Sequence, residues 1–283
     1  MHNTGGTVMN NIDRNQVAVR EQAKKTELGI TKYLNLEPIK NNVIQALGSE
    51  QRAMSFTSSI ISAVQANAQL AECEKASILN AALLGEALNL SPSASLGHYF
   101  MVPFSQKGKP QKQATFQLGY KGYVQLAIRS GNYQKLNVLE IKDGEFKRWD
   151  PLNEELEVDL IEDEGQRAAT ETIGYYGYFV LNNGFKKAIY WTKKHMEAHA
   201  KEYSKSYNSG NSFWNKNFDE MAKKTILRQL LSKWGIMSVD MQTAYRNDMA
   251  VVNDSGNPEY VDNPYNDPDP LDVAATEVVA VTD

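Results

Sequence analysis

The sequence has little from which a covalent or metal-based framework could be built. Cys73 is the single cysteine, and there are four histidines among 283 residues. One cysteine cannot form a disulfide within the chain, and with scattered histidines it makes a poor zinc site. No apolar run reaches the roughly 18 residues of a membrane-spanning helix, and the start lacks the pattern of a signal peptide. We therefore expect a soluble, cytoplasmic protein with no membrane partner.

Familiar catalytic motifs are also missing. The sequence contains no G-x-x-x-x-G-K-[ST] phosphate loop, which argues against ATP-driven strand exchange or helicase action. His195 and His199 are four residues apart, but Glu197 occupies the third position of H-M-E-A-H, whereas the metalloprotease helix needs it in the second. We expect no cofactor, no metal and no catalytic residue, and hence a binding protein rather than an enzyme.

The most informative absence is that of acidic side chains from residues 87–139, in a chain with 34 acidic and 30 basic residues. An ordinary protein surface mixes both signs of charge. The cations of this stretch are Lys107, Lys109, Lys112, Lys121, Arg129 and Lys135. Aromatic residues such as Tyr99, Phe104, Phe116 and Tyr120 lie between them. Cations attract phosphates and rings stack on unpaired bases, so the pattern favours single-stranded nucleic acid as the ligand. The alternative is that the rings are core residues and the lysines ordinary surface.

Charge is also unevenly distributed along the chain. Residues 253–283 hold eight of the 34 acids and no base, so residues 1–252 carry 26 acids against 30 bases, although the whole chain has a net charge of −4. Such asymmetry indicates a basic nucleic-acid-binding body with an acidic appendage. We expect a flexible arm at 1–35, a single domain for DNA binding, annealing and oligomerisation at 36–252, and a disordered acidic tail at 253–283.

The order of the expected elements defines an α+β fold. Apolar stripes predict helices near 38–48, 56–64 and 75–88, followed by a hairpin of 99–104 with 114–118 and a helix over 120–130 that ends at Gly131. Asp143-Gly144 predicts a hairpin of 133–141 with 145–149, and further strands are expected at 174–181 and 187–191. The result is a curved antiparallel sheet made of hairpins and packed on helices, with an N-terminal helical segment and disordered ends.

A second basic segment follows these strands. It includes an expected helix at 193–203, a polar loop at 204–212 and a helix that starts near Asn217. From the two basic regions we predict twelve DNA contacts. They are Lys109, Lys112, Gln117, Tyr120, Lys121 and Arg129 in the first region, and Tyr203, Lys205, Tyr207, Lys216, Lys224 and Arg228 in the second. For Arg129, at the end of a helix, a favourable interaction with the helix dipole is an equal explanation.

Residues 82–131 resemble the RecT family of phage recombinases. The resemblance rests on the runs A-L-L-G-E-A-L-N-L-S-P, L-G-H-Y-F-M-V-P-F, Q-L-G-Y-K-G-Y and L-A-I-R-S-G, in this order. Ser91-Pro92 departs from the acidic residue expected before the proline, and the likeness extends over about 36–250. It implies an ATP-independent single-strand annealing protein of the bacterial host cytoplasm, which coats single-stranded DNA as a ring or helical filament and leaves an annealed duplex. It also implies a phage 5′-to-3′ exonuclease as partner. For the acidic tail three roles stay open: it shields the DNA-binding groove or repels neighbouring tails, it is a solubilising end, or it docks a host single-stranded DNA-binding protein.

Two alternatives to annealing stay open. Asp143 with Glu145-Phe146-Lys147 is similar to the E-x-K pattern of a metal-dependent DNA nuclease, although the preceding hairpin and helix offer no further carboxylate for Mg²⁺. The other alternative is a plain module that binds single-stranded DNA without regard to sequence and without annealing it.

Overall fold

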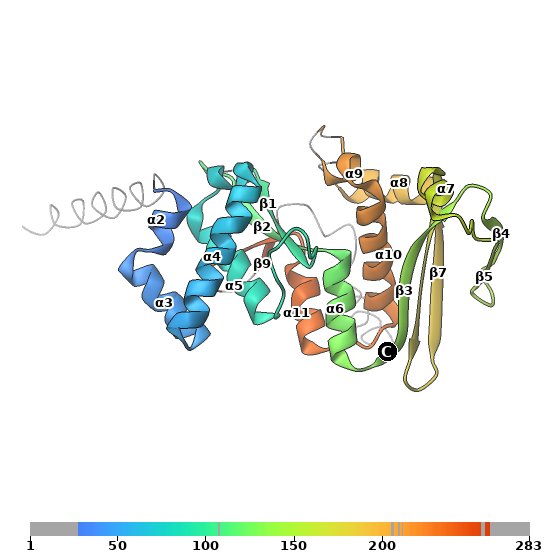
Figure 1. Cartoon of the computed structure of the whole chain (residues 1–283), viewed down its shortest axis with the longest axis horizontal. Helices are drawn as coiled ribbons and strands as arrows, with labels where there is room; N and C mark the ends of the chain where they lie inside the picture. The colour runs from blue at the N-terminus through green and yellow to red at the C-terminus, as the bar shows by residue number, and fades with distance from the viewer. Residues whose placement is uncertain are drawn as a thin grey trace, which may run out of the picture.

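The computed structural model is elongated, with the N-terminal helices at one end, a sheet at the opposite end, and the last described helices and strands back in its middle (Figure 1). The structure describes residues 28–106, 108–204, 207, 208, 210, 212–255 and 258–260. Its first part is helical: α2 (Ile30–Leu34), α3 (Glu37–Leu47), α4 (Glu50–Ala66), the 3₁₀ helix η1 (Ala68–Glu72) and α5 (Lys75–Ala87). Ile60, Leu70 and Ile78 are buried where these helices meet. The expected N-terminal helical segment is therefore confirmed.

A four-stranded sheet lies next to these helices. It has the order β1-β2-β8-β9, with β1 (Tyr99–Phe104), β2 (Gln113–Leu118), β8 (Ala250–Val252) and β9 (Pro258–Tyr260), and every pairing is antiparallel. Strands β1 and β2 form the predicted hairpin, in which Tyr99 pairs with Leu118 and Phe104 with Gln113. The end of the described chain thus returns to a sheet that begins near residue 99.

Two helices connect this sheet to the rest of the molecule. Helix α6 (Tyr120–Ser130) ends at Gly131, whose φ of 69° is the left-handed conformation that the sequence predicted. Helix α10 (Phe218–Trp234) packs between α6 and the second sheet, and α11 (Val239–Asn247) follows it (Figure 1). Leu227 and Leu230 of α10 join the large core that reaches the N-terminal helices, whereas Ala222 and Ile226 join a smaller core under the second sheet.

The second sheet corrects one predicted hairpin. Strand β3 (Tyr133–Lys142) pairs with β6 (Thr172–Leu181), which pairs in turn with β7 (Lys186–Thr192). The Asp143-Gly144 turn does not return the chain to β3, because β4 (Phe146–Asp150) pairs instead with β5 (Glu155–Val158). Strands β3 and β6 have ten residues each and β4 has five, so β6 offers the longer row of cross-strand contacts. Strands β6 and β7 include the predicted strands 174–181 and 187–191, and they pair as a hairpin.

Three further helices complete the described fold. Helix α7 (Glu164–Ala169) follows β5, α8 (Lys193–Tyr203) follows β7, and the short α9 (Phe213–Lys216) precedes α10. The expected fold class is confirmed as a mixed α+β structure with antiparallel sheets, although the strands divide into three sheets. No helix in the described ranges has the length and apolar character needed to cross a membrane.

The described elements extend beyond the expected domain limits at both ends. Helix α2 lies inside the stretch expected to be an arm, because Tyr33 and Leu34 are apolar enough to be buried against the core. Strand β9 lies inside the stretch expected to be a tail and pairs with β8. The other residues of the expected arm and tail, 1–27, 256, 257 and 261–283, lie outside the described part of the chain.

Candidate nucleic-acid interface

A pocket of 370 Å³ opens where β2 leads into α6, opposite α9 and the first turns of α10. Its wall includes Phe100 of β1, Phe213 of α9 and Glu220 of α10. Four of the twelve predicted contact residues also line it: Gln117, Tyr120, Lys121 and Lys224. The fold therefore brings together residues from both basic regions, which are about 100 positions apart in the chain.

The N-terminal end of α6 lines this pocket with Gly119, Tyr120 and Lys121. Gly119 is the N-cap, no side chain caps the helix, and its first turn contains no acidic residue. The amide groups of Tyr120 and Lys121 have no carbonyl within the helix to bond, and the helix dipole adds partial positive charge at this end. A helix N-terminus with a nearby cation suits a phosphate group.

Close backbone contact explains the glycines of this turn. The Gly119 amide donates a hydrogen bond to the His98 carbonyl at 2.8 Å. A Cβ on Gly119 would lie 2.2 Å from the Gly97 carbonyl oxygen, and one on Gly122 would lie 2.1 Å from that of His98. The G-Y-K-G run therefore allows α6 to pack directly on the backbone of residues 97–98, and this packing places Lys121 at the pocket.

Lys121 is the exposed cation of the pocket, and no ion pair is found for it among the described residues. Together with Arg129 it lowers the pKa of His98, although burial is the larger cause. The Tyr120 ring is already covered by a cation, because the Lys223 ammonium lies 4.7 Å from its centroid. Lys223 also pairs with Glu140 at 3.0 Å and with Glu220 at 2.8 Å, so the one carboxylate of the pocket wall has a cationic partner.

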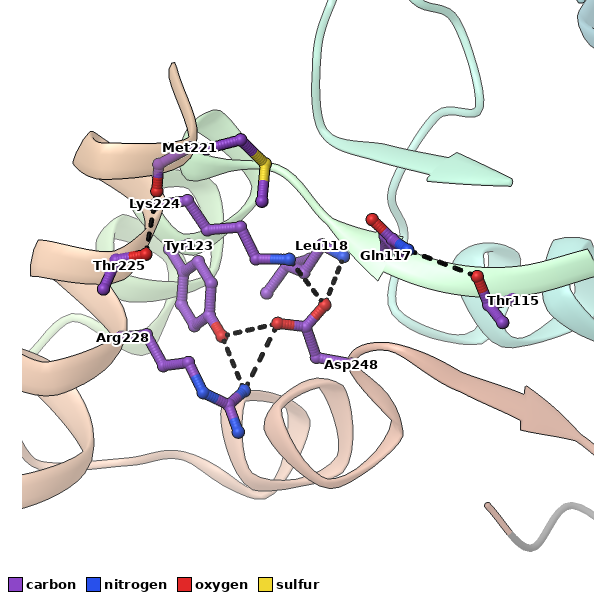
Figure 2. A network of polar contacts seen from close by, with 9 residues as sticks. All are labelled: Thr115, Gln117, Leu118, Tyr123, Met221, Lys224, Thr225, Arg228 and Asp248. Atoms are coloured by element: carbon purple, nitrogen blue, oxygen red, sulfur yellow. Dashed lines mark hydrogen bonds and ion pairs between the residues drawn. The ribbon is translucent and has the colours of Figure 1, made fainter. Parts of the chain in front are cut away.

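Lys224 has a buried partner behind the pocket, Asp248 (Figure 2). One oxygen of the Asp248 carboxylate accepts hydrogen bonds from the Lys224 ammonium and the Leu118 amide, both at 2.9 Å. The other oxygen accepts from the Tyr123 hydroxyl and from the Arg228 guanidinium, both at 3.2 Å. Asp248 is fully buried and the side chain of Lys224 is 7% exposed. The network ties β2, α6 and α10 to the end of α11.

The network limits how far Lys224 and Arg228 are available to contact DNA. Burial lowers the pKa of Lys224, while the charge of Asp248 acts in the opposite direction. Burial raises the pKa of Tyr123, and Asp248 raises it further. The two predicted contacts therefore have an internal carboxylate as partner, and the fold leaves them little open surface. Sequence reasoning missed Asp248 because it is far from residues 87–139 along the chain. In the fold, however, it contacts Leu118 and Tyr123 of that acid-free stretch.

Three other predicted contacts of the first region lie away from the pocket. Lys112 pairs with Glu72 at 2.7 Å, and that hydrogen bond raises its pKa. Lys109 is exposed in the β1–β2 turn. The five residue-to-residue steps from Lys112 to Gln117 span about 17 Å of extended strand, so the turn and the pocket are at opposite ends of the hairpin. Arg129 donates to the Leu88 carbonyl at 2.8 Å, beyond the end of α5, so helix capping accounts for part of its role.

The other described contacts predicted in the second basic region, Tyr203, Tyr207 and Lys216, lie on α8, on α9 and on the segment between these helices. Tyr207 packs 6.4 Å from Trp214, and the Lys201 ammonium lies 5.8 Å from the Tyr207 ring. Tyr203 is 4.5 Å from His199, and Lys216 is exposed at the end of α9. Lys205, like Lys107, lies outside the described residues. Phe213 is three residues before Lys216 and connects this region to the pocket.

The two histidines belong to a row of rings that sequence reasoning did not identify. His195 stacks on Trp191 at 4.2 Å between ring centroids, and His199 meets the same indole edge-on at 5.2 Å. The spacing of four residues from Trp191 to Tyr203, visible in the sequence, could have indicated this row. The described part of the chain contains no group of three or more His, Cys, Asp or Glu residues able to hold a metal ion.

The nuclease pattern corresponds to a structural carboxylate. Glu145 is fully buried and accepts hydrogen bonds from the Lys142 amide at 2.8 Å, the Ile161 amide at 3.2 Å and Arg167 at 2.6 Å. Lys147 pairs with Asp159 at 3.5 Å. Both oxygens of Glu145 are used within the fold, so this carboxylate is poorly suited to hold Mg²⁺.

Cations and aromatic rings around one groove are typical of proteins that bind single-stranded nucleic acid. Comparison with known proteins identifies the family. The model of the RecT family matches residues 54–262, and the chain belongs to this family. It is 37% identical over 268 residues to YqaK of Bacillus subtilis (strain 168), covering 92% of this chain and 87% of that protein. It is 28% identical over 218 residues to Protein RecT of Escherichia coli (strain K12), covering 76% of this chain and 78% of that protein. Family membership implies a single-strand annealing recombinase.

Proposed function

We propose that this protein anneals complementary single strands of DNA without ATP, in phage homologous recombination. The observation that carries the proposal is the pocket at the start of α6, where the exposed Lys121, the uncapped helix end and the rings of Phe100 and Phe213 converge. The protein acts as a binding surface rather than a catalyst. It needs no cofactor, because pairing of bases supplies about 1.4 kcal/mol per base-pair step.

Binding in the pocket is independent of sequence. Lys121 and the first amides of α6 attract a phosphate, and phosphate contacts carry no sequence information. Gln117 and Tyr120 line the same pocket and contact the sugar and base beside that phosphate. The Watson–Crick edges of the other bases stay open, so that a second strand can pair with them and leave with the first as annealed duplex.

The other predicted contacts have different roles in this proposal. Lys109, Lys112, Arg129, Tyr203, Lys205, Tyr207 and Lys216 guide the strand toward and away from the pocket. Lys224 and Arg228 act through Asp248 and position β2 and α6.

The protein coats DNA as a homo-oligomer, in a ring or helical filament. Exposed apolar side chains at two distant places support this part of the proposal: Met54 on α4 is 64% exposed and Leu152, between β4 and β5, is 87% exposed. Figure 1 shows α4 and the β4–β5 hairpin near opposite ends of the molecule. Two different surfaces suit a head-to-tail contact, which forms rings or open filaments. A 5′-to-3′ exonuclease that exposes the strand and a host single-stranded DNA-binding protein are the proposed partners.

The test is annealing of two complementary, fluorescently labelled oligonucleotides without ATP, with and without Mg²⁺, followed by a denaturing gel. The proposal expects faster duplex formation with both strands intact, and slower annealing by Lys121→Ala. Binding without faster annealing would contradict it and favour a plain binding module. Shortened strands that appear only with Mg²⁺ would favour the nuclease instead.

A further inference from the structure

A second cavity of 510 Å³ adjoins the pocket at α6. It lies between α4, the start of η1 and the loop before β1. The two cavities share Ala94, Phe100 and Phe213 as wall residues. The volume falls within the usual range for small-molecule sites, about 300–1,000 Å³.

The chemistry of this cavity differs from that of its neighbour. None of the described residues that line it carries a charge, whereas the pocket at α6 has Lys121, Glu220 and Lys224 in its wall. Its polar side chains are five serines and one asparagine: Ser59, Ser62, Asn67, Ser91, Ser93 and Ser95. A phosphate has no cationic partner here, so the cavity suits an uncharged guest with polar edges.

Some of the serine hydroxyls form hydrogen bonds within the fold, but they keep further hydrogen-bonding sites for a ligand. Ser59 donates to the Phe56 carbonyl at 2.7 Å, and the hydroxyls of Ser93 and Ser95 are 2.8 Å apart. A serine hydroxyl has one donor and two acceptor sites, and its hydrogen rotates to suit the partner. Such a lining can meet donor or acceptor groups on any base edge.

Aromatic rings stand between the two cavities. The ring centroids of Phe100 and Phe213 are 6.3 Å apart, and the planes are tilted by 39°. Both rings contact both cavities, so a nucleotide whose phosphate lies at Lys121 has an aromatic face beside its base. Stacking on rings is tolerant of sequence, because every base has such a face.

We propose that the serine-lined cavity receives one unstacked nucleobase of the strand whose phosphate lies at Lys121. This inference rests on the proposed function and adds a base site to it. The base stacks against Phe100 or Phe213 and its polar edge meets the serine hydroxyls. One base in each bound segment is thereby withheld from pairing until the strand is released to its complement.

The experiment compares two strands of equal length, oligothymidylate and a strand in which every base is replaced by an abasic tetrahydrofuran. The native protein should bind oligothymidylate about five- to 150-fold more tightly, the range expected for a stacked base. Ser62→Leu fills the cavity from α4. It should reduce this preference while leaving the affinity for the abasic strand and the salt dependence unchanged. Ser95→Leu fills it from the loop before β1 and should do the same.

Ser55→Leu is the matched control, because Ser55 is exposed on the same helix and lines neither cavity. It should keep the preference of the native protein. Equal affinity of the native protein for both strands, or an undiminished preference in both filled variants, would overturn the base site. An equal loss of affinity for both strands in Ser62→Leu and Ser95→Leu would also count against the base site, since that result indicates a general effect on binding. If the native protein binds neither strand, the proposed function itself fails.

Discussion

The carboxylate of Asp248 accepts a hydrogen bond from the Leu118 amide at 2.9 Å, across 130 positions of the chain. Leu118 is the last residue of β2, and the next residue is the N-cap of α6. The contact therefore holds the end of α11 against the strand–helix junction that forms the pocket. The same carboxylate neutralises Lys224, which lines that pocket from α10. Pocket shape and fold stability are coupled through one side chain.

Asp248→Asn should strongly destabilise the fold. The substitution leaves Lys224 and Arg228 in a buried network without their counter-charge, and breaking a buried pair in this way costs about 3–5 kcal/mol. Denaturant unfolding followed by circular dichroism measures the change. Asp143→Asn is the control, because Asp143 is exposed in the β3–β4 turn, and it should stay within about 0.5 kcal/mol of the native protein. A native-like midpoint for Asp248→Asn would contradict the assigned role.

Lys121→Ala should weaken binding to all single strands alike. Removing one phosphate contact should reduce the slope of log affinity against log salt by about 0.7 for a single strand. Fluorescence anisotropy at several salt concentrations measures both quantities. Lys40→Ala removes the same charge from α3, where Lys40 pairs with Glu50 at 3.4 Å, and should leave the slope unchanged. An unchanged slope for Lys121→Ala would show that this cation is ordinary surface.

Local patterns predicted the elements that depend on neighbours in the sequence. Helix α6 with its stop at Gly131, the β1–β2 hairpin and strands β6 and β7 all appear where the sequence placed them. The acid-free stretch also drew attention to Gln117, Tyr120 and Lys121, which line one pocket.

Long-range partners could not be predicted from the sequence. Three contacts depend on the assembled fold. Strand β3 pairs with β6 and not with β4, Asp248 lies beside Lys224, and Lys112 pairs with Glu72. A stretch of sequence without acidic residues can still have acidic side chains from other parts of the chain beside it in the fold. The cations of the second region therefore divide into exposed ones, such as Lys216, and ones with a buried partner, such as Lys224.

Gly119→Ala and Gly122→Ala should each destabilise the fold and weaken DNA binding. The added Cβ would lie 2.2 Å and 2.1 Å from backbone carbonyl oxygens, so α6 must shift away from residues 97–98. Overpacking of this kind costs about 1–3 kcal/mol, and the shift also displaces Lys121. Thermal unfolding and anisotropy measure the two effects. Gly29→Ala is the control, because a Cβ there meets nothing within 4 Å. Native-like stability in both α6 variants would contradict the close packing.

Tyr99→Phe should leave stability unchanged or raise it by up to about 1 kcal/mol. The Tyr99 hydroxyl is buried and has no hydrogen-bond partner among the described residues, whereas its ring stacks on Phe116 at 4.9 Å. Removing an unsatisfied hydroxyl removes its desolvation cost and keeps the stacking. Tyr175→Phe is the comparison, because the Tyr175 hydroxyl donates to Asp219 and its loss should cost about 1.5–3 kcal/mol. Equal losses in the two variants would contradict the difference between these buried tyrosines.

Glu145 should make stability depend on acid pH. Burial tends to raise the pKa of Glu145, but the bonds from Arg167 and from the Lys142 and Ile161 amides outweigh it, and the pKa is lowered. The ionised carboxylate therefore stabilises the fold above the pKa of the unfolded chain, about 4.3, and this stabilisation is lost as pH falls through the lower folded value. Glu145→Gln should be less stable than the native protein at pH 7, and the difference should shrink below about pH 4. Urea unfolding at a series of pH values measures it. Glu155→Gln, at an exposed position of β5, is the control. If the difference in unfolding free energy between Glu145→Gln and the native protein does not change with pH, the negative charge of Glu145 does not stabilise the fold.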